Sequence, residues 1–300
     1  VGLNKIKVFG QEISLGYIYV IPLILFFGLI MYPLFRVVYL SFFNISFLNP
    51  AMKQMVGLGN YRSLFDLNAA FIPALTRSLV WVAGSVTLKI IMGMLGALLF
   101  NREFTGRNIY RGLSIIPWGI PWAVSAMMWG WTFNTQYGFI NAILSRMGLI
   151  SESIGFLSSP NLAFVSLMVV DAWIGIPFMI IMLEAGLKGI PTQLYEVAEM
   201  DGANPWQSFF YVTLPQIKGV LTTATLLSTV WTFNSFDPIW ILTQGGPINA
   251  TTTLPIAIYQ SGFQMIGGGD LGQAAAMTIA QVIVVSIIAF FYLRALRSQE

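Results

Sequence analysis

Few side chains of this 300-residue sequence are suited to catalysis, because only 9% of its residues are charged and it contains neither histidine nor cysteine. Imidazole acid–base chemistry, thiol nucleophiles, disulfides and Cys/His metal sites are therefore excluded. The phosphate-binding pattern G-x-x-x-x-G-K-[ST] does not occur either. We therefore expect that the chain is not an enzyme and has no ATP site of its own. The sequence predicts no catalytic residue, no metal ligand and no cofactor, and its remaining polar side chains favour binding.

A polar loop at residues 191–216 carries three of the few carboxylates, Glu196, Glu199 and Asp201, between apolar stretches. Its turn residues predict two short helices, the first ending at a left-handed glycine and the second starting with an Asn-Pro pair. Two short helices are unstable alone, so they must pack on the chain's own helix ends or on a soluble partner. The residues predicted to begin and end these helices are Thr192, Gly202, Asn204 and Pro205.

A polar and aromatic stripe runs at helical spacing along the apolar stretch 220–242. A sugar presents polar edges and apolar faces, so hydroxyl groups beside a flat aromatic surface are suited to bind it. The alternative is ordinary packing between helices through small and hydroxyl side chains. We expect the stripe to line a substrate cavity. The stripe comprises Ser228, Trp231, Thr232 and Ser235, and three further candidates for the same cavity are Asp237, Gly175 and Phe178.

Two charged residues, Lys89 and Asp171, fall deep inside apolar stretches. If these stretches are helices that rise ~1.5 Å per residue, both side chains lie roughly 14–15 Å from the membrane surface. An unpaired charge at that depth costs about 2.5–3.5 kcal/mol, so each requires a partner. We predict an intramembrane ion pair that locks two helices together. The alternative leaves Lys89 in the cavity, where it would select an acidic sugar.

The stretches that position these residues are long and apolar, since 56% of the residues are hydrophobic and the mean hydropathy is +0.75. A helix needs about 20 apolar residues to cross the ~30 Å hydrocarbon layer of a membrane. The sequence therefore predicts an all-α integral membrane protein with a single transmembrane domain over residues 1–300. The first stretch is too long for a cleaved signal and is interpreted as a retained span. Six stretches meet the length requirement: 16–43, 79–100, 113–133, 162–185, 220–242 and 274–293.

Lysine and arginine residues are shared unevenly between the two sides of these spans. The N-terminus, residues 101–112, residues 186–219 and the C-terminus carry nine of them, whereas the remaining loops carry four. Because positively charged loops stay in the cytoplasm, both termini and the polar loop are predicted to be cytoplasmic. The net charge of +3 is small and indicates no patch for nucleic acid.

Helix-breaking residues fall inside three of the predicted spans. Pro117, Gly119 and Pro121 interrupt the third span, and Pro177 and Pro238 lie in the fourth and fifth. Proline removes a backbone donor, and freed carbonyl groups are tolerated at membrane depth only against protein or a wet cavity. Ordinary kinking is the alternative for any one proline, but their number favours a pathway through the protein.

The spacing of motifs in the polar loop is specific. Glu196-Val197-Ala198 is followed by Gly202 and then by Leu214-Pro215. This order resembles the EAA loop of ABC-importer permeases, with Val197 and Val212 as small apolar departures from it. In that family the loop forms coupling helices that sit in a groove of an ATPase subunit. The resemblance implies that the docking residues are Glu196, Ala198, Asp201, Gly202 and Ala203.

Four other segments are similar to the carbohydrate-uptake branch of the same family, in its maltose-permease F-type subunits: VGLGNYRSLF, GLSIIPWGIPWAV, FNSFDPIWILTQGGPINATTTLPIAIYQSGF and GDLGQAAAM. The resemblance implies a type I ABC-importer permease that moves a sugar or oligosaccharide by alternating access. It also implies a location in a bacterial or archaeal cytoplasmic (inner) membrane, in contact with membrane lipid. The implied protein partners are a second homologous permease subunit, two cytoplasmic ATPase subunits that bind the ATP, and an extracytoplasmic solute-binding protein.

Two other functions stay open. A permease of the same superfamily for a glycerol-phosphate-type or anionic oligosaccharide solute needs a cation that faces the cavity, and Lys89 is available for that role. An ion-coupled secondary transporter is the second alternative, and that class needs no EAA loop. A membrane-embedded enzyme is disfavoured because the sequence lacks histidine, cysteine and a paired-carboxylate motif.

Overall fold

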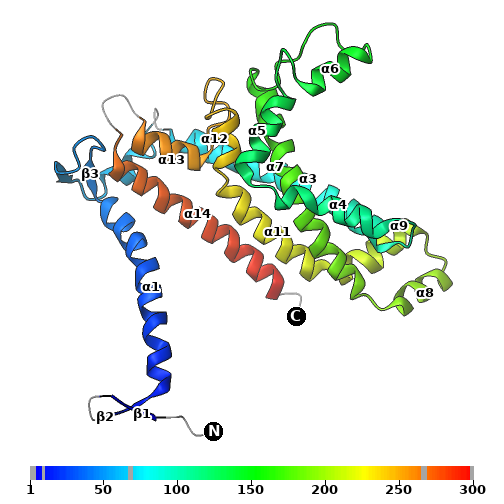
Figure 1. The fold of residues 1–300 in the computed structure, drawn as a ribbon, viewed down its shortest axis with the longest axis horizontal. Helices are drawn as coiled ribbons and strands as arrows, with labels where there is room; N and C mark the ends of the chain where they lie inside the picture. The colour runs from blue at the N-terminus through cyan, green and yellow to red at the C-terminus, as the bar shows by residue number, and fades with distance from the viewer. Residues whose placement is uncertain (1–4, 9–10, 67–69, 265–268, 298–300) are drawn as a thin grey trace. The chain divides into compact units, whose positions relative to one another are not determined.

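The computed structural model describes residues 5–8, 11–66, 70–264 and 269–297, and most of them are helical (Figure 1). Two compact units divide the chain. Unit 1 comprises residues 1–67 and 258–280, and unit 2 comprises residues 68–257 and 281–300. Every candidate site residue predicted above belongs to unit 2.

The described residues of unit 1 form one long helix, one short helix, two antiparallel hairpins, the end of α13 (Leu254–Phe263) and the first residues of the last helix. The hairpins depart from the all-α expectation. They lie outside the apolar stretches, where hydropathy predicts no element and where pairing two short strands satisfies backbone N–H and C=O groups. The elements are β1 (Lys5–Val8), β2 (Gln11–Ser14), α1 (Leu15–Leu40), β3 (Phe43–Ile45), β4 (Lys53–Met55), α2 (Gly59–Ser63), the end of α13 and the start of α14 (Leu271–Arg297).

Asp270 connects β3 to the beginning of α14 within unit 1. Its Oδ1 accepts hydrogen bonds from the backbone N–H groups of Ile45, at 3.4 Å, and of Gly272, at 2.8 Å. Asn60 adds a second connection, because its Nδ2 donates to the carbonyl oxygens of Ser41, at 2.9 Å, and Phe43, at 2.8 Å. Side-chain bonds to the backbone therefore hold this unit together where its helices end.

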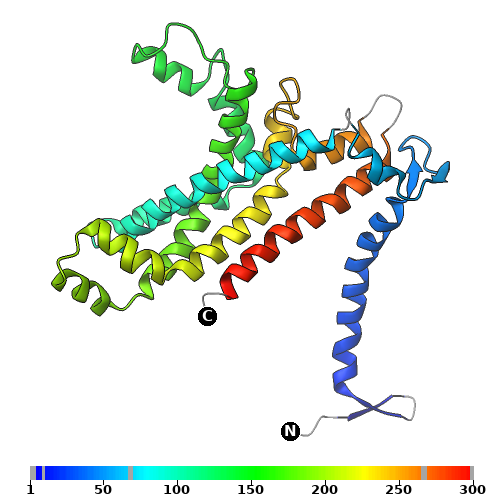
Figure 2. The same ribbon diagram turned by 180° about the vertical axis from the view of Figure 1, so that it is seen from behind.

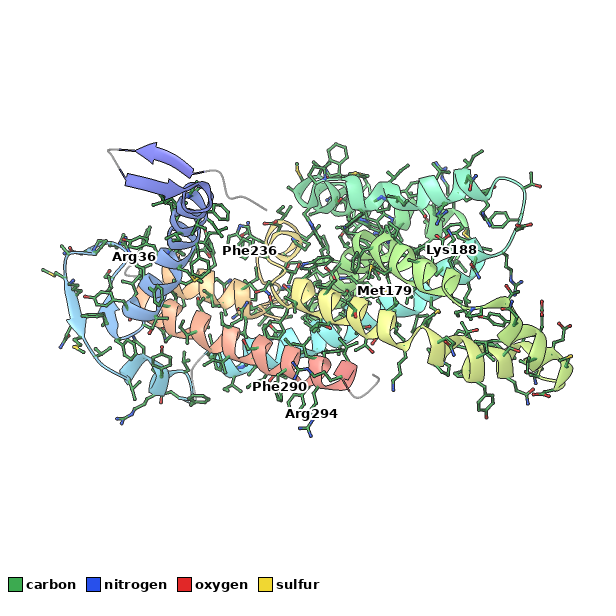
Figure 3. All side chains as sticks on the ribbon, turned by 90° about the horizontal axis from the view of Figure 1, so that it is seen from below. Arg36, Met179, Lys188, Phe236, Phe290 and Arg294 are labelled. Carbon is green, nitrogen blue, oxygen red and sulfur yellow. The ribbon has the colours of Figure 1, made fainter. Side chains whose placement is uncertain are left out.

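Three helices form the centre of unit 2: α3 (Phe71–Asn101), α7 (Pro160–Lys188) and α11 (Lys218–Phe233), which pack alongside one another (Figure 2). Small residues on α3 allow this close packing, because a Cβ at Gly96 would lie 2.6 Å from Ile180 Cδ1. Met179 is fully buried among the dense side chains of the unit (Figure 3). Helix packing through small residues is typical of membrane proteins, where lipid supplies no hydrophobic driving force between helices.

The predicted third span, 113–133, is interrupted as expected. Helix α4 (Arg107–Gly119) ends where Ile120 and Pro121 take extended backbone conformations, and α5 (Trp122–Thr132) begins after them. Proline lacks an N–H and cannot continue the hydrogen-bond ladder of α4. The third span is thus two helices that both pack against α7, and α6 (Phe139–Arg146) follows them.

The fifth predicted span, 220–242, is also two helices. Helix α11 ends at Phe233, and α12 (Asp237–Leu242) begins with Pro238 in its first turn. Proline suits the first turn of a helix, where its missing N–H would have no intrahelical partner. Pro177, by contrast, lies inside a continuous α7, so the fourth span is not broken there. Helix α13 (Leu254–Phe263) comes after α12 along the chain.

Four helices in the described part of the chain are long and apolar enough to cross a membrane. They coincide with the predicted first, second, fourth and sixth spans, whose ends differ from the prediction by one to four residues, except that the second begins at residue 71 and not at residue 79. The third and fifth spans fall short of that length only because each is divided in two. The four candidate spans are Val20–Leu40, Phe71–Asn101, Pro160–Lys188 and Leu271–Arg297.

Candidate functional site

Lys89 and Asp171 meet at the centre of unit 2. Lys89 Nζ lies 2.6 Å from Asp171 Oδ2 and donates a hydrogen bond of 2.8 Å to Thr232 Oγ1. Both charged side chains are buried, with Lys89 only 4% exposed. Asp171 Oδ1 has no hydrogen-bond partner among the residues that the structure describes. This cluster, named the buried lock (Lys89, Asp171 and Thr232), joins α3, α7 and α11 around one neutralised charge pair.

Gly175 makes room for the buried lock. It follows Asp171 by one turn of α7, and a Cβ at Gly175 would lie 2.5 Å from Lys89 Cε and 2.8 Å from Lys89 Cδ. Because those atoms belong to a side chain held at its end by an ion pair, the Lys89 stem cannot simply move away. Gly175 therefore faces the lock, and it is not among the residues that line the cavity described below.

The predicted stripe divides between two environments. Ser228 and Thr232 are buried between helices, and the carbonyl oxygen of Thr232 also accepts a hydrogen bond of 3.0 Å from Trp81 Nε1. Trp231 is 52% exposed, and it lines a cavity together with Ser235. Half of the stripe thus packs helices together, and the other half faces open space.

That open space is a cavity of about 480 Å³, named the aromatic cavity, where the break between α4 and α5 meets the break between α11 and α12. Such a volume is typical of a site for a small molecule. Its walls combine three indole rings with amide, hydroxyl and carboxylate groups, which is the mixture that a sugar requires. The lining residues are Trp118, Trp122, Val230, Trp231, Asn234, Ser235, Phe236, Asp237 and Pro238.

Phe178 supports the aromatic cavity from behind. Its ring centroid lies 4.8 Å from that of Trp231 in an edge-to-face arrangement, and 6.2 Å from that of Trp118. The three rings come from α7, α11 and α4. Aromatic pairs in this range stabilise each other, so Phe178 holds the two indoles rather than lining the cavity itself.

Asn234 has a fixed orientation at the edge of the aromatic cavity. Its Oδ1 accepts a hydrogen bond of 2.9 Å from Gln281 Nε2 on α14, and its Nδ2 donates to the carbonyl oxygen of Val230 at 2.8 Å. The second Nδ2 hydrogen has no partner among the residues that the structure describes, so it can donate to a solute. The sequence prediction missed Gln281, Asn234, Trp118 and Trp122. Trp118 lies within the recognised interruption, between Pro117 and Gly119, and Trp122 directly follows Pro121. Asn234 adjoins Ser235, so the sequence pattern could have indicated all three residues.

The polar loop forms the two predicted helices. Helix α8 (Thr192–Met200) is followed by Gly202 with φ +79°, which confirms the left-handed cap. Asn204 and Gln207 form a reciprocal capping box at the start of α9 (Pro205–Ser208), which confirms the predicted start of the second helix. The helix continues through a π-helical turn, η1 (Phe209–Thr213), into α10 (Leu214–Gln216). The predicted cap at Thr192 is wrong, because Pro191 holds the cap position and Thr192 is already helical.

The polar loop leaves several large apolar side chains exposed, although its Phe209 packs against the core of unit 2. Helix α8 has no buried residue, and the loop includes Trp206 at 74%, Tyr211 at 79% and Met200 at 81% exposure. One internal contact steadies it, since Tyr195 Oη and Thr213 Oγ1 lie 3.0 Å apart. The predicted docking residues Glu196, Asp201 and Gly202 are exposed, and Ala198 and Ala203 are half-buried.

A second group of charges lies where α7 approaches the polar loop. Glu184 is 1% exposed, and its Oε1 lies 2.5 Å from Arg111 Nη2 of α4 and 3.0 Å from Lys188 Nζ. The sequence prediction missed this group. Its signal was Glu184 inside a predicted span with Lys188 one turn later, but nothing local indicates Arg111.

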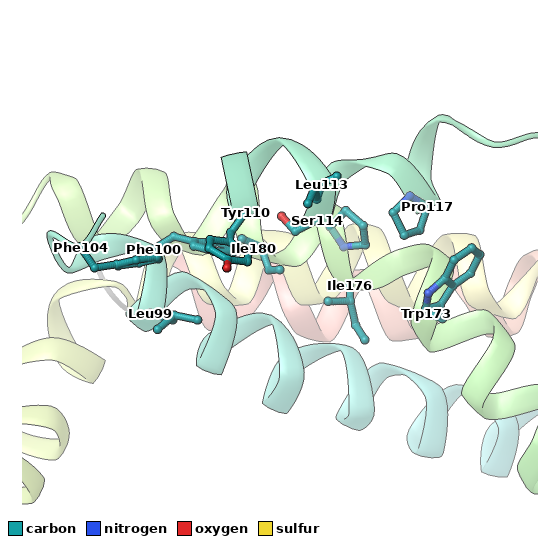
Figure 4. A pocket seen from close by; sticks show the side chains of 11 residues that line it. Leu99, Phe100, Phe104, Tyr110, Leu113, Ser114, Pro117, Trp173, Ile176 and Ile180 are labelled. Carbon is teal, nitrogen blue, oxygen red and sulfur yellow. The ribbon is translucent and has the colours of Figure 1, made fainter. Parts of the chain in front are cut away.

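A larger cavity, of about 570 Å³, lies between α3, α4 and α7 (Figure 4). None of its described lining residues is charged, and Ser114 Oγ already donates to the carbonyl oxygen of Arg111 at 2.8 Å. A sugar would leave most hydroxyl groups unpaired there, so the smaller aromatic cavity is the better candidate. In the described part of the chain no three His, Cys, Asp or Glu residues gather as a metal site.

The sequence matches a known family over most of its length. A family described as binding-protein-dependent transport system inner membrane component matches residues 89–299. The trehalose/maltose transport system permease protein of Thermococcus litoralis is 34% identical over 287 residues, which cover 95% of this chain and 94% of the relative. The sulfoquinovosyl glycerol transport system permease protein of Agrobacterium fabrum is 32% identical over 272 residues, with 91% and 86% covered.

Solved structures share the fold at lower identity. A bacterial ABC transporter involved in the import of the acidic polysaccharide alginate matches with a TM-score of 0.79 and 24% identity, covering 95% of each chain. The MetNI methionine ABC transporter, in an inward-facing conformation, matches with a TM-score of 0.56 and 20% identity, covering 77% of this chain and 96% of that one. The arrangement of helices is therefore shared with transporters that are only 20–24% identical to this chain.

Proposed function

This chain belongs to the family of binding-protein-dependent transport system inner membrane components, and we propose that it is the permease subunit through which an ABC importer carries a sugar or oligosaccharide into the cell. The family confirms the resemblance predicted from the EAA spacing and the carbohydrate-uptake segments. The protein is a multi-pass, mostly helical membrane component and not a catalytic subunit. Its relatives with named solutes handle trehalose/maltose and sulfoquinovosyl glycerol.

The observation that carries the proposal is the exposed apolar surface of the polar loop. A loop that folded only for itself would bury Trp206, Tyr211 and Met200, which are all more than 70% exposed. Exposed aromatic side chains beside carboxylates are suited to a protein interface. We place the groove of a cytoplasmic ATPase subunit on this loop, with Glu196, Ala198, Asp201, Gly202 and Ala203 as the docking residues.

The remaining features of the proposal concern the assembly. Two ATPase subunits bind the ATP, because this sequence contains no phosphate-binding loop. A second homologous permease subunit completes the pathway, and an extracytoplasmic solute-binding protein delivers the sugar, as the alginate transporter has such a periplasmic partner. Closing of the ATPases moves the polar loops and turns the cavity from one side of the membrane to the other.

In this proposal the chain crosses a bacterial or archaeal cytoplasmic membrane six times, with α4–α5 and α11–α12 as the two interrupted spans, and both termini are cytoplasmic. The sugar passes through the aromatic cavity. Trp231 offers a stacking surface, Ser235 and Asn234 offer hydrogen-bonding groups, and Phe178 holds the ring of Trp231. The interruptions supply unpaired backbone groups where the pathway is wet.

The test of the proposal uses the assembled complex in proteoliposomes. Trp206→Ala and Glu196→Lys should lower binding-protein-stimulated ATP hydrolysis by about tenfold or more, since interface tryptophans commonly carry 2 kcal/mol or more of binding energy. Trp131→Ala is the matched control, because Trp131 is 75% exposed but lies on α5, outside the loop. Equal stimulation in all three variants, with the ATPase still bound, would contradict docking at the polar loop.

A further inference from the structure

The described residues that line the aromatic cavity carry negative charge only. Asp237 is the only charged residue among the described residues that line it, and its side chain is exposed. Within the described ranges, the ion pairs formed by basic side chains do not involve Asp237. A solute in this part of the pathway therefore meets a carboxylate and no balancing cation.

Lys89, the cation that could have faced the solute, does not line the cavity. Its Nζ lies 2.6 Å from Asp171 Oδ2 and 2.8 Å from Thr232 Oγ1, and the residue is 4% exposed. Gly175 packs against the aliphatic stem of Lys89, and the side chain of any larger residue at position 175 would collide with that stem. The positive charge of Lys89 is therefore neutralised by Asp171, and its ammonium group is too deeply buried to contact a solute.

The walls of the cavity strengthen the effect of the remaining charge. Trp118, Trp122 and Trp231 contribute large aromatic surfaces to the same cavity wall as Asp237. Clefts with walls of low dielectric constant focus the field of a charge, so a carboxylate there repels anions more strongly than it would in bulk water. Neutral sugars feel no such repulsion and can accept or donate hydrogen bonds to the same carboxylate.

We infer that this permease is selective for uncharged sugars, and that Asp237 is the residue that excludes anionic sugars such as uronates from the aromatic cavity. The inference rests on the proposed function and deepens it by naming the charge class of the substrate. The buried lock contributes by keeping Lys89 away from the solute. The shared fold does not decide this point, because a structural neighbour imports an acidic polysaccharide.

The local charge can be measured directly because the chain contains no cysteine. In the assembled complex, with cysteine-free partner subunits, Ser235→Cys is treated with a cationic and an anionic methanethiosulfonate of similar size. We expect the cationic reagent to react at least about fivefold faster, after normalisation to a free thiol in solution. Adding Asp237→Asn should bring the ratio close to that of the free thiol, whereas Glu152→Gln, another exposed carboxylate of unit 2, should leave it unchanged.

The sugar itself is tested by protection of the same cysteine against a neutral methanethiosulfonate. Maltotriose should protect Ser235→Cys at least about fivefold better than trigalacturonate at equal concentration, and Asp237→Asn should narrow that difference. A ratio of reagent rates near one, or equal protection by the two sugars, would overturn the inference. Binding-protein-stimulated ATP hydrolysis, measured on the same preparation, distinguishes failure of the proposed function from failure of the charge selectivity. If stimulation is absent, the proposed function is wrong. If stimulation is present but the reagent rates or the protection by the two sugars are equal, only the charge selectivity is wrong.

Discussion

Lys89 Nζ and Asp171 Oδ2 lie 2.6 Å apart, although their residues are separated by the whole of α4, α5 and α6 in the sequence. The pair joins α3 to α7, and the hydrogen bond from Lys89 to Thr232 extends the connection to α11. A charge buried in this way is tolerated because its partner is equally buried and close. The buried lock therefore sets the relative position of the three helices at the centre of unit 2.

The first prediction tests whether the buried lock stabilises the structure or acts on the solute. Asp171→Asn or Lys89→Met alone leaves one uncompensated buried charge or polar group, and each should destabilise the complex by about 3–5 kcal/mol. The double variant Lys89→Met with Asp171→Leu should recover most of this loss, because it buries no charge. Thermal unfolding and yield of the detergent-purified complex measure both effects.

Ile91→Ala is the control for that series, since Ile91 lies on the same helix and is 51% exposed. It should change the unfolding temperature little. If Lys89→Met alone assembled as well as the unaltered chain and lost only uptake of anionic sugars, Lys89 would act on the solute and the structural pairing would be wrong.

A second prediction concerns Gly175. Gly175→Ala places a methyl group 2.5 Å from Lys89 Cε, so it should destabilise the complex by about 1–3 kcal/mol, the usual cost of overpacking. Gly219→Ala is the matched control, because nothing lies within 4 Å of a Cβ at that position of α11. That control should be neutral or slightly stabilising, as alanine favours helices by up to about 1 kcal/mol over glycine. Similar unfolding temperatures for the two variants would show that the Lys89 stem can yield.

A third prediction concerns the ring of Trp231 as a stacking surface for the sugar. Trp231→Ala should lower sugar uptake by an amount equivalent to about 1–3 kcal/mol while the complex still assembles, because a stacked ring and its support from Phe178 are lost. Leu227→Ala serves for comparison, since Leu227 is an exposed residue of the same helix outside the cavity. Uptake of radiolabelled sugar, corrected for the amount of complex, is the measurement. An equal loss in both variants would indicate ordinary packing.

A fourth prediction concerns the contact between α4 and the end of α7. Arg111→Met removes the closest partner of the buried Glu184 and should destabilise the complex by about 1–3 kcal/mol, reduced by the partial exposure of Arg111 and by the remaining Lys188. Arg111→Met combined with Glu184→Leu should restore stability. Arg107→Met on the same helix is the comparison, because no described residue forms an ion pair with Arg107. If it destabilises as much as Arg111→Met, the loss is not specific to Glu184.

Local rules were enough for the long helices and for the polar loop. The continuous apolar stretches predicted α1, α3, α7 and α14 to within several residues at each end, because length and hydropathy are properties of neighbouring residues. Gly202 and the Asn204–Gln207 capping box were equally local, since each needs only a backbone angle or a partner three residues away. Thr192 shows the limit of such rules, because a cap can shift by one residue without any change in composition.

The division of the stripe was beyond those rules. Helical spacing places Ser228, Trp231 and Thr232 on one side of α11, with Ser235 just beyond its end at Phe233, but a side of a helix can face another helix and an open cavity at once. Which residue meets which environment depends on how α3 and α7 cross α11, and that is decided by contacts between distant residues such as Trp81 and Thr232. The same reason explains Gly175, which spacing assigned to the cavity and packing assigned to the lock.

By itself, the sequence determined that this protein is a helical membrane permease with a polar loop of two short helices, and it predicted that Lys89 and Asp171 pair with each other. The tertiary structure confirmed this pair over the alternative in which Lys89 faces the cavity, and only the tertiary structure showed that Arg111 reaches Glu184 and that Gln281 orients Asn234. Hydropathy, helix capping and the free-energy cost of burying a charge depend on a few neighbouring residues or on single side chains, so the sequence alone is enough to predict them. Pairing between helices depends on their crossing angles and depth, which arise only when the whole set of side chains is packed.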